Sequence, residues 1–367
     1  MHAVITGSGL YTPPERIANE ELVASLNAWV ARDNATHAEA IARGERAPLQ
    51  PSSDEFIVRA SGIRARHVVE RTGILDVERM RPRLRRRGND EPSLMCEMGL
   101  AAAREALDAA GREPADVDGV IVAASNMERA YPAVAVELQH HLGARGFAYD
   151  MNVACASAAF ALQAAADAVR GGSARAVLVV SPEICSGHLN FRDRDSHFIF
   201  GDACTALLVE GAGRGFEILG TRLLTQFSSH IRNNAGFLNR VEEPPREEAD
   251  CLFVQEGRKV FKEVVPMVAE LIQAQLDAVG LAPAQVRRFW LHQANLGMNQ
   301  LIARRVLGRE ASAEEAPVIL DEYANTSSAG SVIAFHLHQA DLAAGETGVL
   351  CAFGAGYSAG SAVLRRR

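Results

Sequence analysis

Long apolar runs, paired cysteines and a basic excess are all missing from this 367-residue sequence. No apolar run approaches the roughly 18 residues needed to cross a bilayer. The N-terminal stretch MHAVITGSGLYTPP has no basic segment and is too short in apolar residues for a signal peptide. The formal charge is −7, from 38 basic and 45 acidic residues, whereas nucleic-acid-binding proteins usually carry a basic excess. We therefore expect a globular protein with no membrane segment and no broad affinity for nucleic acid.

The six cysteines are too sparse for a disulfide scaffold, and no C-x-x-C pair occurs among them. Five lie in or beside apolar or helix-like stretches: Cys96, Cys185, Cys204, Cys251 and Cys351. We interpret these five as small apolar residues in a reducing compartment, with the cytoplasm as the expected location.

An internal repeat organises the chain. Residues 107–117 read LDAAGREPADV and residues 276–286 read LDAVGLAPAQV, with seven of eleven positions identical at an offset of 169. An amphipathic Ala- and Leu-rich segment precedes each copy, and an apolar run follows it. Both copies therefore predict a helix, a glycine cap, a proline-bearing loop and a buried strand. Duplication of one structural unit explains this match better than chance.

The segments that follow each copy also agree, each with a turn of small residues, a helix and another apolar strand. Strands that are apolar on both faces are typical of sheets covered on both sides by helices. We predict an α/β protein of two similar halves, residues 1–215 and 216–367. Two segments break the pattern, the polar 29–53 and the arginine-dense 80–89, and we interpret both as surface insertions.

Three polar residues fall at equivalent ends of predicted strands. Cys155 lies where a strand meets an Ala-rich helix, and the positive end of a helix favours a thiolate; the alternative is a buried structural cysteine. His292 follows the second copy's strand, where sites form in α/β folds, although a core histidine is the alternative. Asn325 opens the helix equivalent to the one after Cys155, and a plain N-cap is its alternative. Their convergence favours one shared site.

The same residues carry a family resemblance. Cys155, His292 within HQAN, Asn325 within NTS and the C-terminal FGAGYSAGS occur in the order found in the β-ketoacyl-ACP synthase III enzymes of the thiolase superfamily. The stretch FRDRDSHFIFGD, residues 191–202, also resembles that family. The resemblance covers almost the whole chain, apart from the two insertions and about 226–250. It implies a thiolase-like fold with layers in the order α-β-α-β-α.

Residue types separate the reactions of the superfamily. Thiolases use a second cysteine where this chain has Ala352, and Cys351 beside it should face the other way. Elongating synthases use a second histidine where Asn325 stands. Enzymes that join two acyl chains use a glutamate near the active-site loop, and Glu128 keeps that alternative open. A carrier-binding relative without activity would be expected to have lost part of the Cys–His–Asn set. A dinucleotide-binding oxidoreductase lacks its G-x-G-x-x-G motif here.

The resemblance implies a specific chemistry. Thiolate Cys155 takes an acyl group from an acyl-CoA primer, and malonyl-ACP then loses CO2 and condenses with that group. The backbone N–H groups of Cys155 and Ala355 form the oxyanion hole, while His292 and Asn325 donate hydrogen bonds to the enolate. The reaction needs no metal, nicotinamide or flavin.

The resemblance implies further contacts. Lys262, Arg304 and Arg305 match basic residues that face the acidic acyl carrier protein, although a solvated helix face is an equal alternative. Arg194 matches a residue at the CoA entrance. Tyr131 matches one that closes the partner's acyl pocket in a homodimer.

Three positions depart from members that start from acetyl-CoA, where Trp and Arg hold the adenine. Phe56 and Ala60 stand at those two places, and Gly297 replaces a basic residue after the His motif. With the extra segment 29–53 near the tunnel, these departures lead us to hypothesise a medium-chain primer rather than acetyl.

Overall fold

The computed structural model describes residues 2–367 and is built on one mixed sheet of nine strands, in the order β11-β12-β13-β8-β1-β7-β6-β4-β5. The N-terminal strands are β1 (Val4–Tyr11), β4 (Gly119–Ala123), β5 (Phe147–Met151), β6 (Ala176–Ile184) and β7 (Asp202–Glu210). The C-terminal strands are β8 (Phe216–Ser228), β11 (Val286–Leu291), β12 (Thr347–Gly354) and β13 (Gly356–Arg366). Within the sheet, the two groups meet where β1 pairs with β8, at Val4 with Glu217 and Ile5 with Phe216.

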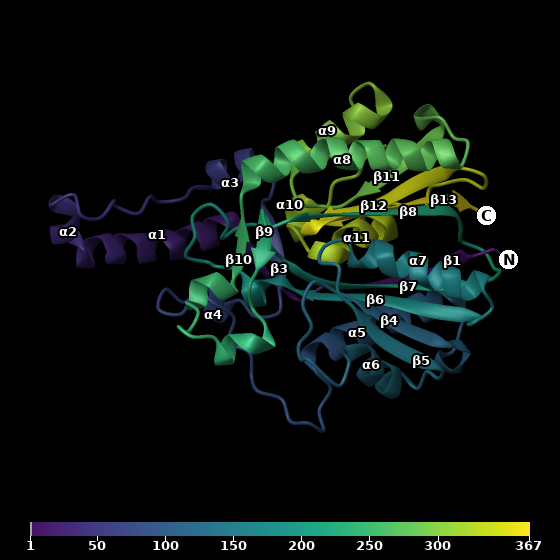
Figure 1. The fold of residues 1–367 in the computed structure, drawn as a ribbon, viewed down its shortest axis with the longest axis horizontal. Helices are drawn as coiled ribbons and strands as arrows, with labels where there is room; N and C mark the ends of the chain where they lie inside the picture. The colour runs from purple at the N-terminus through teal and green to yellow at the C-terminus, as the bar shows by residue number, and fades with distance from the viewer. Residues whose placement is uncertain (1) are drawn as a thin grey trace.

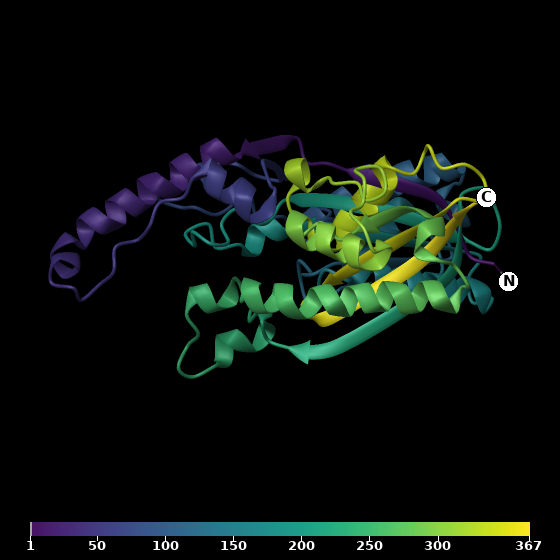
Figure 2. The same ribbon diagram turned by 90° about the horizontal axis from the view of Figure 1, so that it is seen from above.

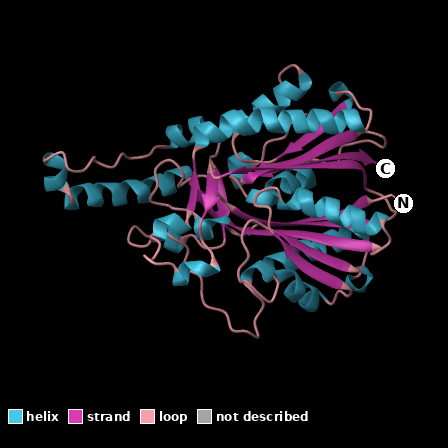
Figure 3. Ribbon diagram, viewed as in Figure 1, coloured by secondary structure: helices cyan, strands magenta, loops and turns pink. Residues whose placement is uncertain are grey.

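Helices lie on both sides of each group of strands and between the groups, as Figures 1 and 3 show. The outer helices are α5 (Leu94–Ala110) and α6 (Val134–Leu142) on the N-terminal strands, and α8 (Gly257–Ala278) and α9 (Leu296–Leu307) on the C-terminal strands. The inner helices are α7 (Ser157–Arg170) and α11 (Gly330–Leu337), which share one apolar core with strands of both groups. The predicted α-β-α-β-α layering is confirmed.

The repeated sequence forms the same local structure twice. Helix α5 ends at Gly111, whose φ is 63°, and α8 is followed by Gly280, whose φ is 71°. Each glycine leads to a short 3-10 turn that begins with proline, η1 (Pro114–Asp116) or η5 (Pro283–Gln285), and then to a buried strand, β4 or β11. Glycine tolerates the left-handed conformation that ends these helices, which explains why it is shared by both copies.

Small residues let α5 lie very close to β1. A Cβ at Gly7 would fall 2.0 Å from the carbonyl oxygen of Ala106, and one at Gly9 would fall 2.1 Å from that of Ala102. Neither distance is compatible with a side chain, so the glycines of the N-terminal GSG sequence serve helix–strand packing.

A smaller unit covers one end of the layers. It contains the paired strands β2 (Glu15–Ala18) and β3 (Ala65–Val68) and the helices α1 (Asn19–Thr36), α2 (Ala38–Ala42), α3 (Asp54–Ser61) and α4 (Thr72–Leu75). The far end of α1, together with α2, projects away from the body of the molecule (Figures 1 and 2). The predicted insertion 29–53 begins inside α1 and is not wholly superficial, because Val30 and Ser52 are buried. Asn27 exchanges two hydrogen bonds with the backbone of Ser52 and so fixes the returning chain.

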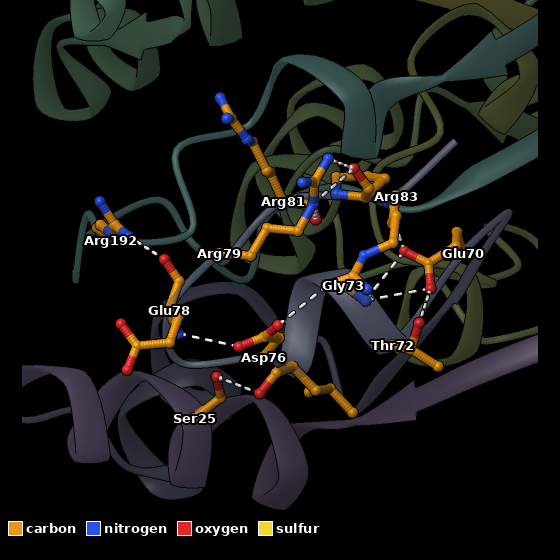
Figure 4. Close-up of polar contacts among 12 residues, drawn as sticks. Ser25, Glu70, Thr72, Gly73, Asp76, Glu78, Arg79, Arg81, Arg83 and Arg192 are labelled. Carbon is orange, nitrogen blue, oxygen red and sulfur yellow. Dashed lines mark hydrogen bonds and ion pairs between the residues drawn. The ribbon is translucent and has the colours of Figure 1, made fainter. Parts of the chain in front are cut away.

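The arginine-dense segment is also tied to the body, and the surface prediction is wrong for Met80, which is buried. The Glu70 carboxylate accepts hydrogen bonds from the backbone N–H groups of Gly73, at 3.0 Å, and Arg83, at 2.6 Å (Figure 4). From the other side, Arg192 donates to the Glu78 carbonyl at 2.9 Å (Figure 4). Most arginines here are held by neighbouring acids or carbonyls, so the segment presents less free positive charge than its sequence indicates.

Three short elements complete the end near the candidate site. Strands β9 (Ile231–Asn233) and β10 (Phe253–Gln255) form a small separate sheet, and α10 (Leu320–Tyr323) precedes Asn325. Across residues 2–367, none of the helices has the length and apolar character required to cross a bilayer.

Candidate active site

A cavity of about 500 Å³ brings Cys155, His292 and Asn325 together. Cys155 lies between β5 and α7, His292 directly follows β11, and Asn325 lies just after α10. The remaining wall is largely apolar, from Phe198, Ile199, Phe200, Ile231, Phe253, Val260, Phe261, Val264, Met298 and Phe353. The cavity thus joins a nucleophile and two polar groups to a space suited to an aliphatic chain.

The backbone is strained around the nucleophile. Ala154, Ala324 and Ser327 have φ values of 48°, 53° and 49°, which non-glycine residues rarely adopt. Ala154 precedes Cys155 and Ala324 precedes Asn325. Strain of this kind persists where the surrounding structure fixes a functional geometry.

The Cys155 thiol is protonated at rest. Burial raises its pKa to about 11, and this desolvation outweighs the opposing hydrogen bonds. Burial thus opposes the predicted preference for a thiolate at this helix end, and it is the larger effect. The largest opposing contribution comes from the Ser327 hydroxyl, which donates to the Cys155 Sγ at 3.3 Å.

Backbone donors also converge on the sulfur. The N–H groups of Ala355 and of Cys155 itself hydrogen-bond to Sγ and lower its pKa. A Cβ at Gly354 would lie 2.6 Å from the Cys155 Cβ and 2.9 Å from its Sγ, so only glycine allows the final turn to come this close. These are the two N–H groups that the resemblance implies for an oxyanion hole.

His292 is a neutral imidazole at pH 7. Its burial lowers the pKa to about 4, while a backbone hydrogen bond at Ser327 acts in the opposite direction. The imidazole ring packs edge-on against the Phe353 ring, with 5.1 Å between the ring centroids. The backbone N–H of His292 donates to the Cys351 carbonyl at 2.8 Å. A neutral ring carries one N–H and can donate a hydrogen bond without bringing a full positive charge.

Asn325 is held with its amide nitrogen available. Its Oδ1 accepts a hydrogen bond from the Ser327 N–H at 2.8 Å, which leaves Nδ2 as the free donor. Its backbone is fixed on both sides, because its N–H donates to the Ile199 carbonyl and its own carbonyl accepts from the Gly201 N–H. Asn325 precedes the 3-10 turn η6 (Ser327–Ala329) and does not itself cap α11, which begins after Ala329.

Two residues of this region escaped the sequence analysis. Ser327 contacts the sulfur, and Glu183, buried at the end of β6, contacts the turn that follows Asn325. The signal for Glu183 was present, since an acidic residue inside the apolar run VLVVSPEIC needs a partner when buried. Nothing in the sequence indicates which partner.

The predicted entrance residues lie outside the cavity wall, except Ala60, which lines it. The Arg194 guanidinium stacks on the Phe56 ring at 3.9 Å, and its Nε donates to the Pro51 carbonyl at 2.7 Å. Gly297 lies in the first turn of α9, where an added Cβ would meet only the Asn295 Oδ1, at 3.4 Å.

The remaining predicted contacts are on the surface. Tyr131 is 85% exposed. Lys262 on α8 and Arg304 and Arg305 on α9 are also exposed, and Arg304 pairs with Glu310 at 3.3 Å. In this protomer none of the four contributes to the cavity wall.

The glutamate and cysteine alternatives find no support in the geometry. Glu128 accepts a hydrogen bond from the Met95 N–H at 3.0 Å at the start of α5, and it lines a different pocket. Cys351 is buried in the core beneath α8 and α9, away from the cavity wall. In this protomer, therefore, Cys155, His292 and Asn325 meet without a neighbouring glutamate or second cysteine in the wall.

Comparisons with known proteins agree with this arrangement. Residues 149–226 match the family model of 3-oxoacyl-[acyl-carrier-protein] synthase III, and residues 276–366 match that of its C-terminal part. A β-ketodecanoyl-[acyl-carrier-protein] synthase of Pseudomonas aeruginosa is 63% identical over 93% of this chain and 99% of its own length. A β-ketoacyl-[acyl-carrier-protein] synthase III of Brucella anthropi is 32% identical over 86% of this chain and 91% of its own length.

Solved structures give the same result. The priming β-ketosynthase of the R1128 polyketide pathway superposes with a TM-score of 0.80 and 26% identity, over 99% of this chain and 96% of that one. A 3-oxoacyl-(acyl carrier protein) synthase III of Pseudomonas aeruginosa superposes with a TM-score of 0.77 and 25% identity, over 100% of this chain and 98% of that one. Fold and site thus define an acyl-transferring condensing enzyme with a thiolase fold. The chain belongs to the β-ketoacyl-ACP synthase III family.

Proposed function

We propose that this enzyme transfers a medium-chain acyl group from CoA to Cys155 and condenses it with malonyl-ACP to give a 3-ketoacyl-ACP. The observation that carries this proposal is the single cavity shared by Cys155, His292, Asn325 and an apolar wall. As written, the reaction takes place between thioester substrates and employs no resident cofactor or metal.

In the first step the Cys155 sulfur attacks the primer thioester and CoA leaves with the thiol proton. Because the resting thiol has a pKa of about 11, its proton is transferred during the attack and ends on the sulfur of the departing CoA. Negative charge then develops on the thioester oxygen, where the N–H groups of Cys155 and Ala355 stabilise it. Covalent capture divides one difficult condensation into two easier steps.

In the second step malonyl-ACP loses CO2 and its thioester oxygen becomes an enolate. The neutral His292 ring and the Asn325 Nδ2 donate hydrogen bonds to that oxygen. The enolate carbon attacks the acyl-Cys155 carbonyl, a carbon–carbon bond forms, and the bond to the Cys155 sulfur breaks. The thiolate that leaves then takes up one proton from solvent, which restores the resting thiol.

Two observations support a medium-chain primer. The wall is formed largely by Phe, Ile, Val and Met side chains, and Ile231 comes from the segment that the family resemblance does not cover. The relative with 63% identity is named for a β-ketodecanoyl product. Malonyl supplies two carbons of such a product, so the primer of that relative has eight, and we propose octanoyl-CoA here.

CoA and the acyl carrier protein would contact different residues of the enzyme. Phe56 and Arg194 stack face to face, and we propose that they separate to take the adenine of CoA between them. The exposed cations Lys262, Arg304 and Arg305 would attract the acidic acyl carrier protein.

We further propose a cytoplasmic homodimer. Strand β5 is an edge of the sheet, and its Phe147 and Tyr149 stack on one another while more than one third exposed. An exposed aromatic edge favours pairing with a second copy. The exposed Tyr131 would then be free to reach the partner's acyl pocket.

The test is synthesis of 3-ketodecanoyl-ACP from octanoyl-CoA and malonyl-ACP, followed by mass spectrometry of the product. We expect the wild-type protein to form this product and Cys155→Ala to form none. A wild-type enzyme that accepts acetyl-CoA in clear preference to octanoyl-CoA would contradict the primer assignment.

A further inference from the structure

Glu183 is an acidic residue in the interior of the molecule. It lies near the end of β6 and is 1% exposed. Four donors surround its carboxylate: the N–H and hydroxyl of Ser125, at 2.9 and 2.6 Å, and the N–H and hydroxyl of Ser328, at 3.1 and 2.5 Å. A buried carboxylate is tolerated only with such partners, so these bonds are a condition of the local fold.

The two serines belong to different loops of the active site. Ser125 follows β4, and its carbonyl accepts a hydrogen bond at 3.0 Å from Asn152, three residues before Cys155. Ser328 lies in the η6 turn, directly after Ser327 and three residues after Asn325. The Ser328 hydroxyl also lies 3.0 Å from the Ala123 carbonyl at the end of β4. The carboxylate therefore joins the loop that supports the nucleophile to the loop that carries the enolate donor.

We propose that Glu183 is a positioning residue, whose carboxylate holds the Cys155 and Asn325 loops in register for catalysis. It touches no substrate, and it acts through Ser125 and Ser328. The inference rests on the proposed function, since Cys155 and Asn325 have their roles there. It adds a third element, from β6, to the two loops that carry the reacting groups.

The electrostatic surroundings agree with this position. Three thiols feel the charge of Glu183: Cys155, Cys185, whose Sγ lies 3.8 Å from the carboxylate, and Cys204. Asp202 on the neighbouring strand β7 also acts on Cys185, and Glu128 and His188 line one pocket with Glu183. The other ionisable residues that line the Cys155 cavity are His292, which is neutral, Asp195 and Arg258. The negative charge of Glu183 raises the pKa of Cys155, and burial raises the pKa of Glu183 itself.

Two substitutions separate position from charge. In Glu183→Gln, the remaining oxygen at the place of Oε1 keeps both N–H donors and the Ser328 hydroxyl. The new amide nitrogen faces the Ser125 hydroxyl, which can turn and accept. Glu183→Gln therefore keeps the loops and removes the charge, whereas Glu183→Ala removes both. Glu137 provides a matched control, because it accepts the N–H and hydroxyl of Ser93, both at 2.7 Å, at the start of α5.

The experiment measures the rate of Cys155 alkylation by iodoacetamide between pH 6 and pH 10, by peptide mass spectrometry, together with the rate of condensation. We expect Glu183→Ala to lower the condensation rate by about 10- to 100-fold through misplacement of the reacting groups. We expect Glu183→Gln to recover most of that loss and to shift the alkylation profile by about one pH unit toward lower pH. Glu137→Ala should change neither the profile nor, by more than about twofold, the rate.

Three results would overturn the proposal. The first is a condensation rate of Glu183→Ala within twofold of wild type, and the second is an equal loss of condensation rate in Glu183→Gln and folded Glu183→Ala. The third is a pH profile of Cys155 alkylation in Glu183→Gln that is not shifted from wild type. If Glu183→Ala does not fold, Ser328→Ala decides, with a smaller loss supporting the proposal and wild-type rates contradicting it. Alkylation requires no substrate, so a wild-type protein that makes no ketoacyl-ACP would contradict the proposed function and leave this readout intact.

Discussion

The Ser327 hydroxyl donates a hydrogen bond to the Sγ of Cys155 at 3.3 Å, although the two residues are 172 positions apart in the chain. That separation is close to the 169-residue offset of the internal repeat. The turn before α7 and the turn before α11 are therefore equivalent places in the repeated unit, and they meet face to face. One turn supplies the nucleophile, and the other supplies the groups that act on it.

Removing the Ser327 hydroxyl should weaken the nucleophile. In Ser327→Ala the thiol loses the hydrogen bond that most lowers its pKa, so the pKa rises further and less thiolate forms at a given pH. We expect alkylation of Cys155 at pH 8 to slow by about 3- to 10-fold, the net value of one ordinary hydrogen bond. Ser331→Ala is the matched control, because that serine is equally buried and its hydroxyl has no partner among residues 2–367. Equal rates for the two variants would contradict this account of Ser327.

The two half-reactions should respond differently to His292. His292→Ala removes a donor to the enolate but leaves the N–H groups of Cys155 and Ala355 in place. We expect condensation to fall by about 100- to 1,000-fold, as when one oxyanion donor is removed elsewhere. Acylation of Cys155 by octanoyl-CoA should fall by less than tenfold. Stopped-flow release of CoA and the rate of ketoacyl-ACP formation measure the two steps, and equal losses in both would contradict the assignment.

Much of the fold follows from local patterns. The repeat, its glycine caps and its apolar strands indicate the layers, because such signals lie within a few residues of each element. Cys155, His292 and Asn325 stand at strand or helix ends, where the fold itself brings side chains together.

Other features depend on contacts between distant segments. The role of Ser327 requires a neighbour 172 residues away, and Glu183 requires donors from two loops. The pKa of Cys155 depends on desolvation in the cavity, which its position at a helix end does not indicate. Met80 was predicted to lie on the surface because the arginines around it make the whole segment look polar, although its own side chain is buried.

Carrier binding should depend on the surface cations. Arg305 is exposed and has no ion-pair partner among the residues that the structure describes, whereas Arg309 pairs with Glu315. We expect Arg305→Glu to raise the KM for malonyl-ACP by about 5- to 20-fold with little change in kcat, and the effect should shrink as salt screens the charges. Arg309→Glu serves as the control on the same surface. An unchanged KM for Arg305→Glu would favour the solvated-face alternative for this residue.

Stability should fall in mild acid because of a buried histidine. His197 is fully buried, and burial lowers its pKa to about 4 from the usual 6.5. Between those values the unfolded chain binds the proton and the folded chain does not, so the free energy of unfolding decreases as the pH falls. Relative to His197→Asn, we expect wild type to lose about 2 to 3 kcal/mol between pH 7 and pH 4.5. Asp202, whose pKa is raised to about 6, acts in the opposite sense but is common to both proteins.

Urea unfolding at the two pH values measures this difference. Parallel losses in wild type and His197→Asn would show that the pKa of His197 is not lowered. Since His197 lies outside the cavity wall, the Cys155 alkylation rate of the variant provides a check that the site is intact.

The most direct test is the mass of the intact protein after incubation with an equimolar mixture of acyl-CoAs from two to twelve carbons. The account predicts one dominant adduct, with the mass of an octanoyl group, mapped to Cys155 and missing from Cys155→Ala. A dominant acetyl adduct, or an adduct that persists in Cys155→Ala, would contradict it.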